Sequence, residues 1–358
     1  MWRVLLVLVS ALLCVPASAV TKPKASAKAA PRKVAATKAA APVQTAHRRS
    51  PYVGAISVDA ATGRVLFEQN ADAEAYPASV TKLMTLLLVM EDVKAGKYSY
   101  DDRVEATAGV ERFSEPSWIG AKTGEKLSVR DLCTALMVES ANDAAIFLAV
   151  HSAGSWEAFV ARMNARAAEL GMVNTKYYNP NGLPPISIVN KREKHYPWKS
   201  FNVSTARDQM LLARQLVKMP EVLSLTSVKT CDLVKTADGF RVSVTRRTNS
   251  PNTPTSPAND ERIIMSMCNH NNVMVKDKLK ILNSDGSEVV DGLKTGYTRE
   301  AGSSVVLTGS RKGKRVIVVV LGSDSQLDEK GRVVKLGSVV RDETARHLLS
   351  DALGSLVW

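Results

Sequence analysis

The residues with the clearest chemical potential are Ser79 and Lys82, three positions apart at the start of an apolar run that extends to Met90. Three residues make almost one helical turn, so the hydroxyl and the amine would lie on one face of a helix. A serine hydroxyl becomes a nucleophile when a base removes its proton. A lysine can be that base if burial lowers its pKa. The pair therefore predicts nucleophilic catalysis, with a capping serine and a solvated lysine as the alternative.

A second polar motif, Ser140-Ala141-Asn142, lies in a short break between two apolar helical segments. Such a break can project a hydroxyl and an amide into a cleft. Two other Ser-x-Asn patterns, Ser200–Asn202 and Ser250–Asn252, lie in loop-like or proline-rich surroundings. We therefore favour Ser140 and Asn142 as site residues, with an ordinary helix cap as the alternative for Ser140.

A third motif, Lys294-Thr295-Gly296, precedes a predicted pair of strands. A glycine on an edge strand allows a substrate backbone to approach closely, and the strand can pair with an extended peptide. Lys294 and Thr295 could hold a terminal carboxylate. The same three letters at Lys122–Gly124 lie in a turn before a predicted helix, so we favour Lys294.

The elements around these motifs indicate an α+β fold. Two strands that form a hairpin, 52–59 and 64–68, open the folded region, and strands at 303–308 and 315–321 precede a closing helix at 342–353. Between them we expect helices at 79–96, 128–138, 143–151, 156–170 and 204–219, a rigid loop at 179–185, and a strand pair with a long exposed loop within 229–266. This order predicts an antiparallel sheet flanked by helices, with a helical lobe inserted after the first hairpin.

The N-terminal region predicts export. Arg3, the apolar stretch 4–15 and the small residues 17–19 are typical of a signal peptide spanning residues 1–19. We therefore expect a protein of the periplasm or cell-wall space, soluble or loosely associated with a membrane. Residues 20–50 contain no Asp or Glu and are rich in Ala, Lys and Pro, which predicts a basic disordered linker.

The chain has a formal net charge of +13, and nine positive charges precede residue 51. The basic linker could make weak contacts with anionic wall polymers or lipid. The signal peptide argues against nucleic acid as a partner. Residues 51–358 are long enough for a large core and form the expected catalytic domain.

Three cysteines would remain after signal cleavage. Cys133 lies in an apolar helical stretch and is expected in the core, whereas Cys231 and Cys268 could pair in an oxidising compartment. The histidines are scattered, and we expect them on the surface or in the core. Trp118 could pack in the core or form a wall of the cleft.

The ordered set of three motifs resembles the penicillin-interacting serine peptidases and β-lactamases. The sequences around the motifs are similar to one branch, the low-molecular-mass D-alanyl-D-alanine carboxypeptidases. The segments that carry this similarity are 76–85, 140–145, 170–183 and 292–298. The resemblance covers about residues 51–355 and implies a β-lactamase/DD-peptidase-like fold.

The resemblance implies a role for each residue of the first two motifs. Ser79 would be the acylated nucleophile and Lys82 its general base. Ser140 would relay protons, and Asn142 would hold Lys82 and the substrate amide.

The third motif would bind substrate. Lys294 and Thr295 would bind the terminal carboxylate beside Gly296. The backbone N–H groups of Ser79 and Tyr297 would form the oxyanion hole, where only the amide of Tyr297 matters.

The implied function is a serine D-alanyl-D-alanine carboxypeptidase that trims peptidoglycan stem peptides through an acyl-enzyme on Ser79. It would need no metal or cofactor, and β-lactams would inhibit it covalently. The nearest alternative is a D,D-endopeptidase that cuts peptidoglycan cross-links, since it shares all three motifs. A β-lactamase is disfavoured because no Glu-x-x-Leu-Asn run is present. A non-catalytic wall-binding or β-lactam-sensing protein would not need Lys82.

One departure from the family pattern concerns the C-terminus. Members of this branch carry a second β-rich domain and an amphipathic anchor. Since the sequence stops at Trp358, soon after the predicted closing helix, we expect neither feature.

Overall fold

The computed structural model describes residues 50–107, 110, 117–184, 200–244 and 262–355, which belong to one compact unit spanning Thr45–Trp358. The predicted signal peptide, nearly all of the basic linker and residues 245–261, which lie within the segment predicted as a strand pair with a long loop, are outside the described residues. The same holds for the Ser250–Asn252 pattern.

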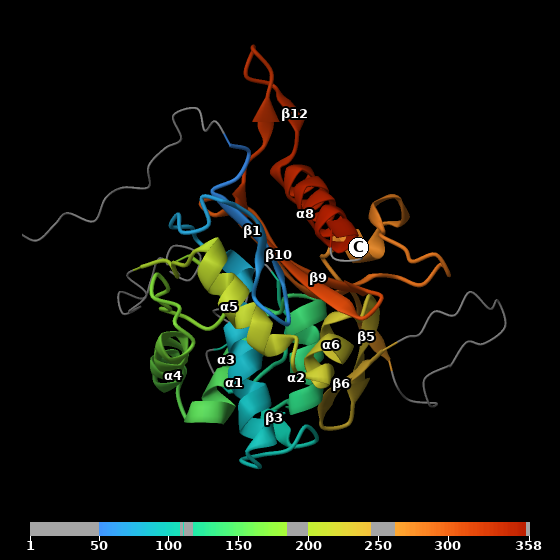
Figure 1. The fold of residues 1–358 in the computed structure, drawn as a ribbon. Coiled ribbons are helices and arrows are strands. Elements are labelled where there is room, and N and C mark those ends of the chain that lie inside the picture. Colours follow the sequence, from blue (N-terminus) through green and yellow to red (C-terminus); the bar gives the residue numbers. More distant parts are fainter. Residues whose placement is uncertain (1–49, 108–109, 111–116, 185–199, 245–261, 356–358) are drawn as a thin grey trace, which may run out of the picture. The chain divides into compact units, whose positions relative to one another are not determined.

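The central feature is a five-stranded antiparallel sheet that joins the two ends of the described chain (Figure 1). Its strand order is β2-β1-β10-β9-β8. The strands are β1 (Gly54–Asp59), β2 (Val65–Gln69), β8 (Val290–Thr298), β9 (Gly302–Arg311) and β10 (Lys314–Ser323). The predicted hairpin and the predicted C-terminal strand pair are both confirmed. Consequently β8, which carries the third motif, is an edge strand.

Both faces of this sheet are buried, which explains the nearly continuous apolar sequence of β10. On one face Val318 and Val320 pack with Leu349 of α8 (Gly337–Ser355). On the other face Ile317 and Val319 belong to the larger core shared with the helices. The sheet is therefore a rigid layer between α8 and a helical lobe.

The predicted helical lobe is confirmed, and its helices are inserted between β2 and β8. They are α1 (Lys82–Lys94), α2 (Val129–Val138), α3 (Asn142–Ala153), α4 (Trp156–Glu169), α5 (Ala206–Leu216) and α6 (Pro220–Thr226). Helix α1 is buried almost all round, as its apolar run predicted. The Ser128 side chain caps α2 by accepting the N–H of Asp131, and Gly154 ends α3 in the left-handed conformation.

The lobe also carries a second five-stranded sheet, which joins the strand pair predicted within 229–266 to three further strands. Its order is β3-β4-β6-β5-β7, from β3 (Arg103–Glu105), β4 (Lys126–Ser128), β5 (Thr230–Thr236), β6 (Gly239–Ser243) and β7 (Ile263–Cys268). Strands β3 and β4 have three residues each and pair with each other, and β4 pairs with β6, where Lys126 lies opposite Gly239. A short apolar alternation of that length gives almost no periodic signal.

The possible pairing of Cys231 with Cys268 is wrong. Cys231 lies opposite Met267, and Cys268 lies opposite Thr230. Directly opposed residues share a face of the sheet and successive residues alternate, so the two thiols point to opposite faces. Cys231 is buried, Cys268 is exposed, and both are free. Cys133 is fully buried in the core, as expected.

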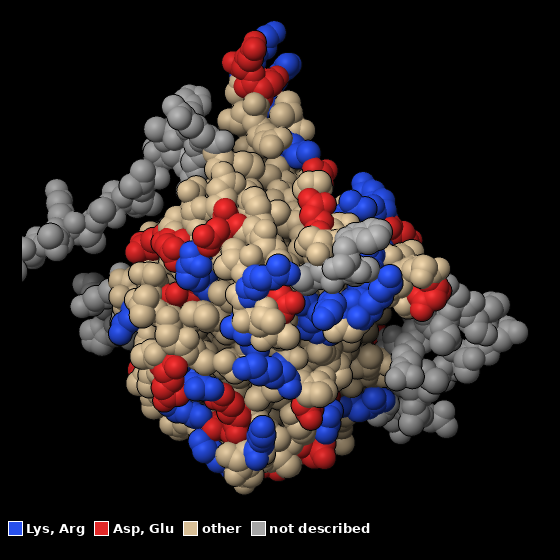
Figure 2. All heavy atoms as spheres, in the orientation of Figure 1, with Lys and Arg blue, Asp and Glu red and all other residues tan. Residues whose placement is uncertain are grey.

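A small hairpin, β11 (Gln326–Leu327) and β12 (Val333–Lys335), lies between β10 and α8. Charged side chains gather at the tip of this hairpin (Figures 1 and 2). Val333 and Val334 of β12 are exposed. Figure 2 also shows acidic and basic side chains interspersed over the visible face of the described residues.

Among the described helices, none alone is long and apolar enough to cross a membrane. Helices α3 and α4 meet the length and composition criteria only as a pair, and they are bent by 85° at their junction. The remaining short helices are η1 (Ala78–Thr81), α7 (Asn272–Val275) and η4 (Asp277–Leu279).

Candidate active site

Ser79 lies in the short 3-10 helix η1, which leads directly into α1. Its Oγ accepts a hydrogen bond of 2.9 Å from Nζ of Lys82. Ala78, the residue before it, has a φ of 48°, in the left-handed region that residues with a Cβ rarely adopt. Such strain persists only where the surroundings impose it, and it is common at functional sites. The three-residue spacing therefore brings the hydroxyl and the amine together, as the sequence predicted.

Lys82 is completely buried, and its amine has two further partners. Nζ donates to Oδ1 of Asn142 at 2.8 Å and to the carbonyl oxygen of Asn181 at 2.8 Å. Burial lowers the pKa of Lys82 well below its ordinary value, and the charge of Lys294 lowers it further, while Asp143 opposes the shift. A lysine with a depressed pKa, hydrogen-bonded to a serine, can act as a base toward that serine.

The loop at 179–183 forms one wall around Lys82, a role that the sequence analysis missed. Its Asn181 carbonyl accepts from Lys82, and its Pro180 carbonyl accepts from Oγ1 of Thr85 at 2.7 Å. Gly182 has a φ of 86°, and an added Cβ there would lie 1.9 Å from the carbonyl oxygen of Ala78. The loop therefore packs directly on the strained turn that carries Ser79.

Asn202, from the rejected Ser200–Asn202 pattern, has a structural position. Its Nδ2 donates to Oγ1 of Thr81 and to the carbonyl oxygen of Asn179, at 3.0 Å each. Its Oδ1 accepts the backbone N–H groups of Tyr178 and Asn179. This buried amide thus joins the loop at 179–183 to η1.

The second motif lies where α2 ends and α3 begins. Ser140 is buried and has a φ of 63°, again in the left-handed region. Asn142 is the first residue of α3, and its backbone N–H donates to the carbonyl oxygen of Ser117 at 2.7 Å. The motif therefore brings the Asn142 side chain to the Lys82 amine, and Ser140 precedes Asn142 by two residues in the sequence.

Trp118 lies beside the second motif. The carboxylate of Asp143 accepts the backbone N–H groups of Ile119 and Gly120, which anchors the segment around Trp118 to the start of α3. The Trp118 side chain is 38% exposed. The side chain is therefore not part of the fully buried core. Residues 111–116, which precede this segment, lie outside the described part of the chain.

The third motif lies on the edge strand β8, as the sequence analysis proposed. Lys294 is buried, and its pKa is lowered to about 7 by burial and by Arg341, against the opposing effect of Glu139. The effect of Lys294 on the pKa of Lys82 shows that the two amines share one electrostatic environment. Thr295 is 6% exposed, whereas the Tyr297 side chain is 67% exposed.

The glycine of the third motif has a second reason beside the one proposed from the sequence. A Cβ at Gly296 would lie 2.7 Å from the carbonyl oxygen of Pro77 and 3.1 Å from the backbone N of Ser79. The close approach is therefore to the chain's own backbone, not only to a substrate. The rival Lys122–Gly124 pattern lies in an exposed turn before β4, as the sequence predicted.

His270 is a candidate site residue that the sequence analysis missed. Desolvation and the charges of Lys294, Lys82 and Arg341 lower its pKa to about 4, although the residue is exposed, so the imidazole lies among the cations of the site. Its neighbour Asn271 is buried and donates to the carbonyl oxygen of Gly292 at 3.5 Å. The cations around His270 come from three distant segments, so no local pattern could single it out.

Comparison with solved structures supports the fold. The D-alanyl-D-alanine carboxypeptidase DacD from Francisella tularensis matches with a TM-score of 0.66 and 28% identity, covering 88% of this chain and 73% of that one. Penicillin-binding protein D2 from Listeria monocytogenes, in its ampicillin-bound form, matches with a TM-score of 0.58 and 27% identity, covering 87% and 98%. The β-lactamase/DD-peptidase-like fold is confirmed.

Comparison with curated sequences gives two informative relatives. The D-alanyl-D-alanine carboxypeptidase DacF of Bacillus subtilis is 29% identical over 288 residues, which cover 79% of this chain and 60% of the relative. The D-alanyl-D-alanine endopeptidase of Pseudomonas aeruginosa is 33% identical over 178 residues, which cover 49% of this chain and 51% of the relative. The chain thus spans about 60% of the length of DacF.

The family assignment rests on a longer match. Residues 39–325, which include all three motifs, match the family model described as D-alanyl-D-alanine carboxypeptidase. Together with the buried Ser79–Lys82 pair, this match shows that the chain belongs to the D-alanyl-D-alanine carboxypeptidase family of serine peptidases.

Proposed function

We propose that this protein is a serine D-alanyl-D-alanine carboxypeptidase that removes the terminal D-alanine from peptidoglycan stem peptides. The observation that carries the proposal is the 2.9 Å hydrogen bond between Lys82 Nζ and Ser79 Oγ at a lysine whose pKa is lowered by burial. The Ser79 backbone packs against Gly296, so the Ser79–Lys82 pair lies beside the edge strand β8. An edge strand can hold an extended peptide.

In the acylation step, neutral Lys82 takes the proton of Ser79 while Oγ attacks the carbonyl carbon of the penultimate D-alanine. The backbone N–H groups of Ser79 and Tyr297 stabilise the oxyanion that forms. The C–N bond then breaks, and a proton passed through Ser140 leaves with the amine of the released D-alanine. An ester between Ser79 and the shortened peptide remains.

In the deacylation step, water gives a proton to Lys82 and attacks the ester carbonyl. The C–O bond breaks, Oγ of Ser79 recovers a proton, and the shortened peptide leaves as a carboxylic acid. Asn142 holds the Lys82 amine in position throughout, because its Oδ1 accepts from Nζ at 2.8 Å.

Substrate binding would use the edge of β8. The charge of Lys294 and the hydroxyl of Thr295 would bind the terminal carboxylate, while the peptide backbone pairs with the strand. A β-lactam carries a carboxylate beside its reactive amide and would acylate Ser79 in the same way. The ampicillin-bound structure of the Listeria protein supports this part of the proposal.

Two measurements test the function: labelling by a fluorescent penicillin, and release of D-alanine from an acetylated tripeptide that ends in D-alanyl-D-alanine. Ser79→Ala should abolish both, and Lys294→Ala should weaken both. The matched controls are Ser200→Ala and Lys122→Ala, which alter the rejected patterns and should leave both signals unchanged. Equal labelling of Ser79→Ala and the unmodified protein would refute the assignment.

A second candidate activity is cleavage of peptidoglycan cross-links, which the similarity to the endopeptidase of Pseudomonas aeruginosa favours. Mass spectrometry of products from purified peptidoglycan fragments separates the two activities. Loss of one D-alanine indicates the carboxypeptidase, and conversion of dimers to monomers indicates the endopeptidase.

The proposal includes export to the periplasm or cell-wall space, supported by the signal-like residues 1–19, and weak anionic contacts of the basic segment 20–50. N-terminal sequencing of the exported protein should find Val20 as the first residue. An N-terminus at Met1 in the mature protein would contradict cleavage after Ala19.

A further inference from the structure

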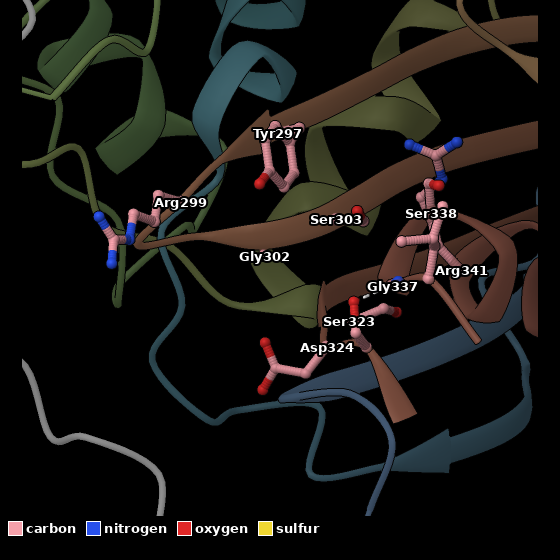
Figure 3. A pocket seen from close by; sticks show the side chains of 11 residues that line it. Tyr297, Arg299, Gly302, Ser303, Ser323, Asp324, Gly337, Ser338 and Arg341 are labelled. Atoms are coloured by element: carbon pink, nitrogen blue, oxygen red, sulfur yellow. Dashed lines mark hydrogen bonds between the residues drawn. The ribbon is translucent and has the colours of Figure 1, made fainter. Parts of the chain in front are cut away.

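A cavity of about 390 Å³ at the end of the main sheet belongs to the candidate active site. Figure 3 shows Tyr297, Arg299 and Arg341 in its lining. Tyr297 directly follows the third motif, and Arg341 lowers the pKa of Lys294. This cavity therefore adds no separate site to the one already described.

Another cavity, of about 310 Å³, lies in the helical lobe, where the last turns of α1 meet the start of α6. Its volume is at the lower end of the range of about 300–1000 Å³ that is typical of ligand-binding pockets. None of the three motifs contributes a residue to its lining. Lys82 and Lys94 are the first and last residues of α1, which puts them about 18 Å apart along the helix axis. The cavity therefore lies outside the active site.

The walls of this lobe cavity are apolar and partly aromatic. Met90 and Val93 come from α1, Tyr100 from the chain that follows it, and Met219 and Pro220 from the start of α6. The Tyr100 hydroxyl donates to Sδ of Met90 at 2.9 Å, which fixes the ring against the end of α1. Methionine side chains adapt to the shape of a ligand, and their sulfur atoms make favourable contacts with aromatic rings. The walls therefore favour a planar aromatic ligand.

The charged side chains of the lobe cavity favour an anion. Lys94 and Lys218 line it and are exposed, and within the described part of the chain neither forms an ion pair with a carboxylate. Lys218 donates instead to Oε1 of Gln215, at 3.1 Å. Glu221 supplies a single carboxylate to the lining. Two cations against one carboxylate leave the opening positive, which attracts a ligand with an acidic group.

Both helices at the lobe cavity lead back to the candidate active site (Figure 1). Helix α1 begins at Lys82, directly after η1, which carries Ser79. Helix α6 ends at Thr226, whose Oγ1 donates to the carbonyl oxygen of Asp291 on β8 at 2.9 Å. A ligand held between the other ends of these two helices would therefore contact one element that positions Ser79 and another that positions β8.

We propose that the lobe cavity is an effector site: it binds an aromatic molecule that carries one acidic group, and the bound molecule changes the rate at which Ser79 is acylated. The ligand would join the end of α1 to the start of α6 and restrain η1 relative to β8. Such restraint lowers the entropic cost of ordering both elements during acylation, so bound ligand should speed this step. The effect on the rate rests on the proposed function, whereas binding does not.

Calorimetric titration with 2-naphthoate tests the binding site. The unmodified protein should bind one molecule, and the neutral 2-naphthamide should bind less tightly. The double variant Lys94→Glu/Lys218→Glu reverses two exposed charges of the lining and should weaken naphthoate binding by about 10-fold. The matched control is Lys278→Glu/Lys330→Glu, which reverses two exposed charges outside the lining and should bind naphthoate as the unmodified protein does.

Because naphthoate is a carboxylate, its binding at Lys294 must be separated from its binding at the lobe cavity. Protein whose Ser79 has been acylated by penicillin has an occupied active site and should still bind one naphthoate. Lys294→Ala should also retain naphthoate binding. Loss of binding in the acylated protein or in Lys294→Ala would place the ligand in the active site and overturn the effector site.

The rate of labelling by a fluorescent penicillin, measured with and without saturating 2-naphthoate, tests the effector role. Naphthoate should raise this rate by at least about 2-fold in the unmodified protein and leave it unchanged in Lys94→Glu/Lys218→Glu. A rate that stays constant or falls in the unmodified protein, or a titration that detects no binding, would overturn the effector site and leave the proposed function standing. Absence of labelling in the unmodified protein would overturn the proposed function and the effect on the rate together, and the titration alone would then decide the binding site.

Discussion

Gly296 and Pro77 are in such close backbone contact that a Cβ on Gly296 would lie 2.7 Å from the carbonyl oxygen of Pro77. This contact sets the distance between the edge strand β8 and the turn that carries Ser79. The separation of β8 from η1 thus depends on the absence of a side chain at position 296.

Gly296→Ala should therefore push β8 away from Ser79. A displacement on the order of 1 Å at a reacting group costs about 10²-fold in rate, so acylation by a fluorescent penicillin should fall by about that factor. The matched control is Gly354→Ala in α8, where an added Cβ meets nothing within 4 Å. Acylation of Gly296→Ala at the unmodified rate would show that the contact does not position β8.

Lys82→Arg should lower the acylation rate by about 10²- to 10⁴-fold, because arginine cannot lose its proton near neutral pH. In the unmodified protein the neutral, reactive fraction of Lys82 rises with pH. Since burial lowers the pKa of Lys82 well below 10.5, the rate should reach its plateau well below pH 10.5. Lys94→Arg, at the exposed end of the same helix, is the control and should keep the unmodified pH profile.

His270→Arg should move the acidic limb of this pH–rate profile to lower pH. The pKa of His270 is about 4, so the imidazole is neutral at pH 7, whereas arginine would add a permanent positive charge beside Lys82 and Lys294. That charge favours the neutral form of Lys82. The control is His347→Arg on the exposed face of α8. An unshifted acidic limb in His270→Arg would show that His270 lies outside the electrostatic environment of the site.

Asn202→Ala should lower the free energy of unfolding by about 1–3 kcal/mol, because it leaves buried groups of Thr81, Tyr178 and Asn179 without their partner. It should also slow acylation, since the loop that holds Lys82 loses its link to η1. Urea unfolding measures the first effect and penicillin labelling the second. Asn174→Ala, at an exposed position near the same loop, should change neither.

Asp92→Ala should lower the free energy of unfolding by about 2–3 kcal/mol. This loss is smaller than the loss expected on breaking a fully buried ion pair, because the partner Arg162 is partly exposed. Asp92 is ion-paired with Arg162 at 2.7 Å and with Lys97 at 2.5 Å.

Desolvation raises the pKa of Asp92, but its hydrogen bonds to Arg162, Lys97 and Ser152 outweigh that effect. The pKa is therefore lowered from 3.8 to about 2. The ionised carboxylate therefore stabilises the fold above about pH 4, and this contribution is lost as the pH falls from 4 through 2. Thermal unfolding between pH 2 and 5 should show a steeper loss in the unmodified protein than in Asp92→Ala. Asp101→Ala, which alters an exposed carboxylate, should retain the steep loss.

Much of this protein can be predicted from its sequence, because the signals are local. The apolar run after Ser79 predicts the buried helix, the Ser128 cap and Gly154 mark helix ends, and the alternation around β9 and β10 predicts strands. The three motifs and their flanks predict the family. Each of these signals depends on residues within one or two turns of one another.

What only the tertiary structure decided concerns contacts between distant segments. The sequence gives no indication that the Asn181 carbonyl meets Lys82, that Asn202 ties a loop to Thr81, or that Cys231 and Cys268 lie on opposite faces of one sheet. Strand register and loop packing determine these relations, and neither has a local pattern. The chemistry of Ser79 and Lys82 was therefore predictable from their types and spacing, whereas the environment that lowers the pKa of Lys82 depends on how the chain folds around it.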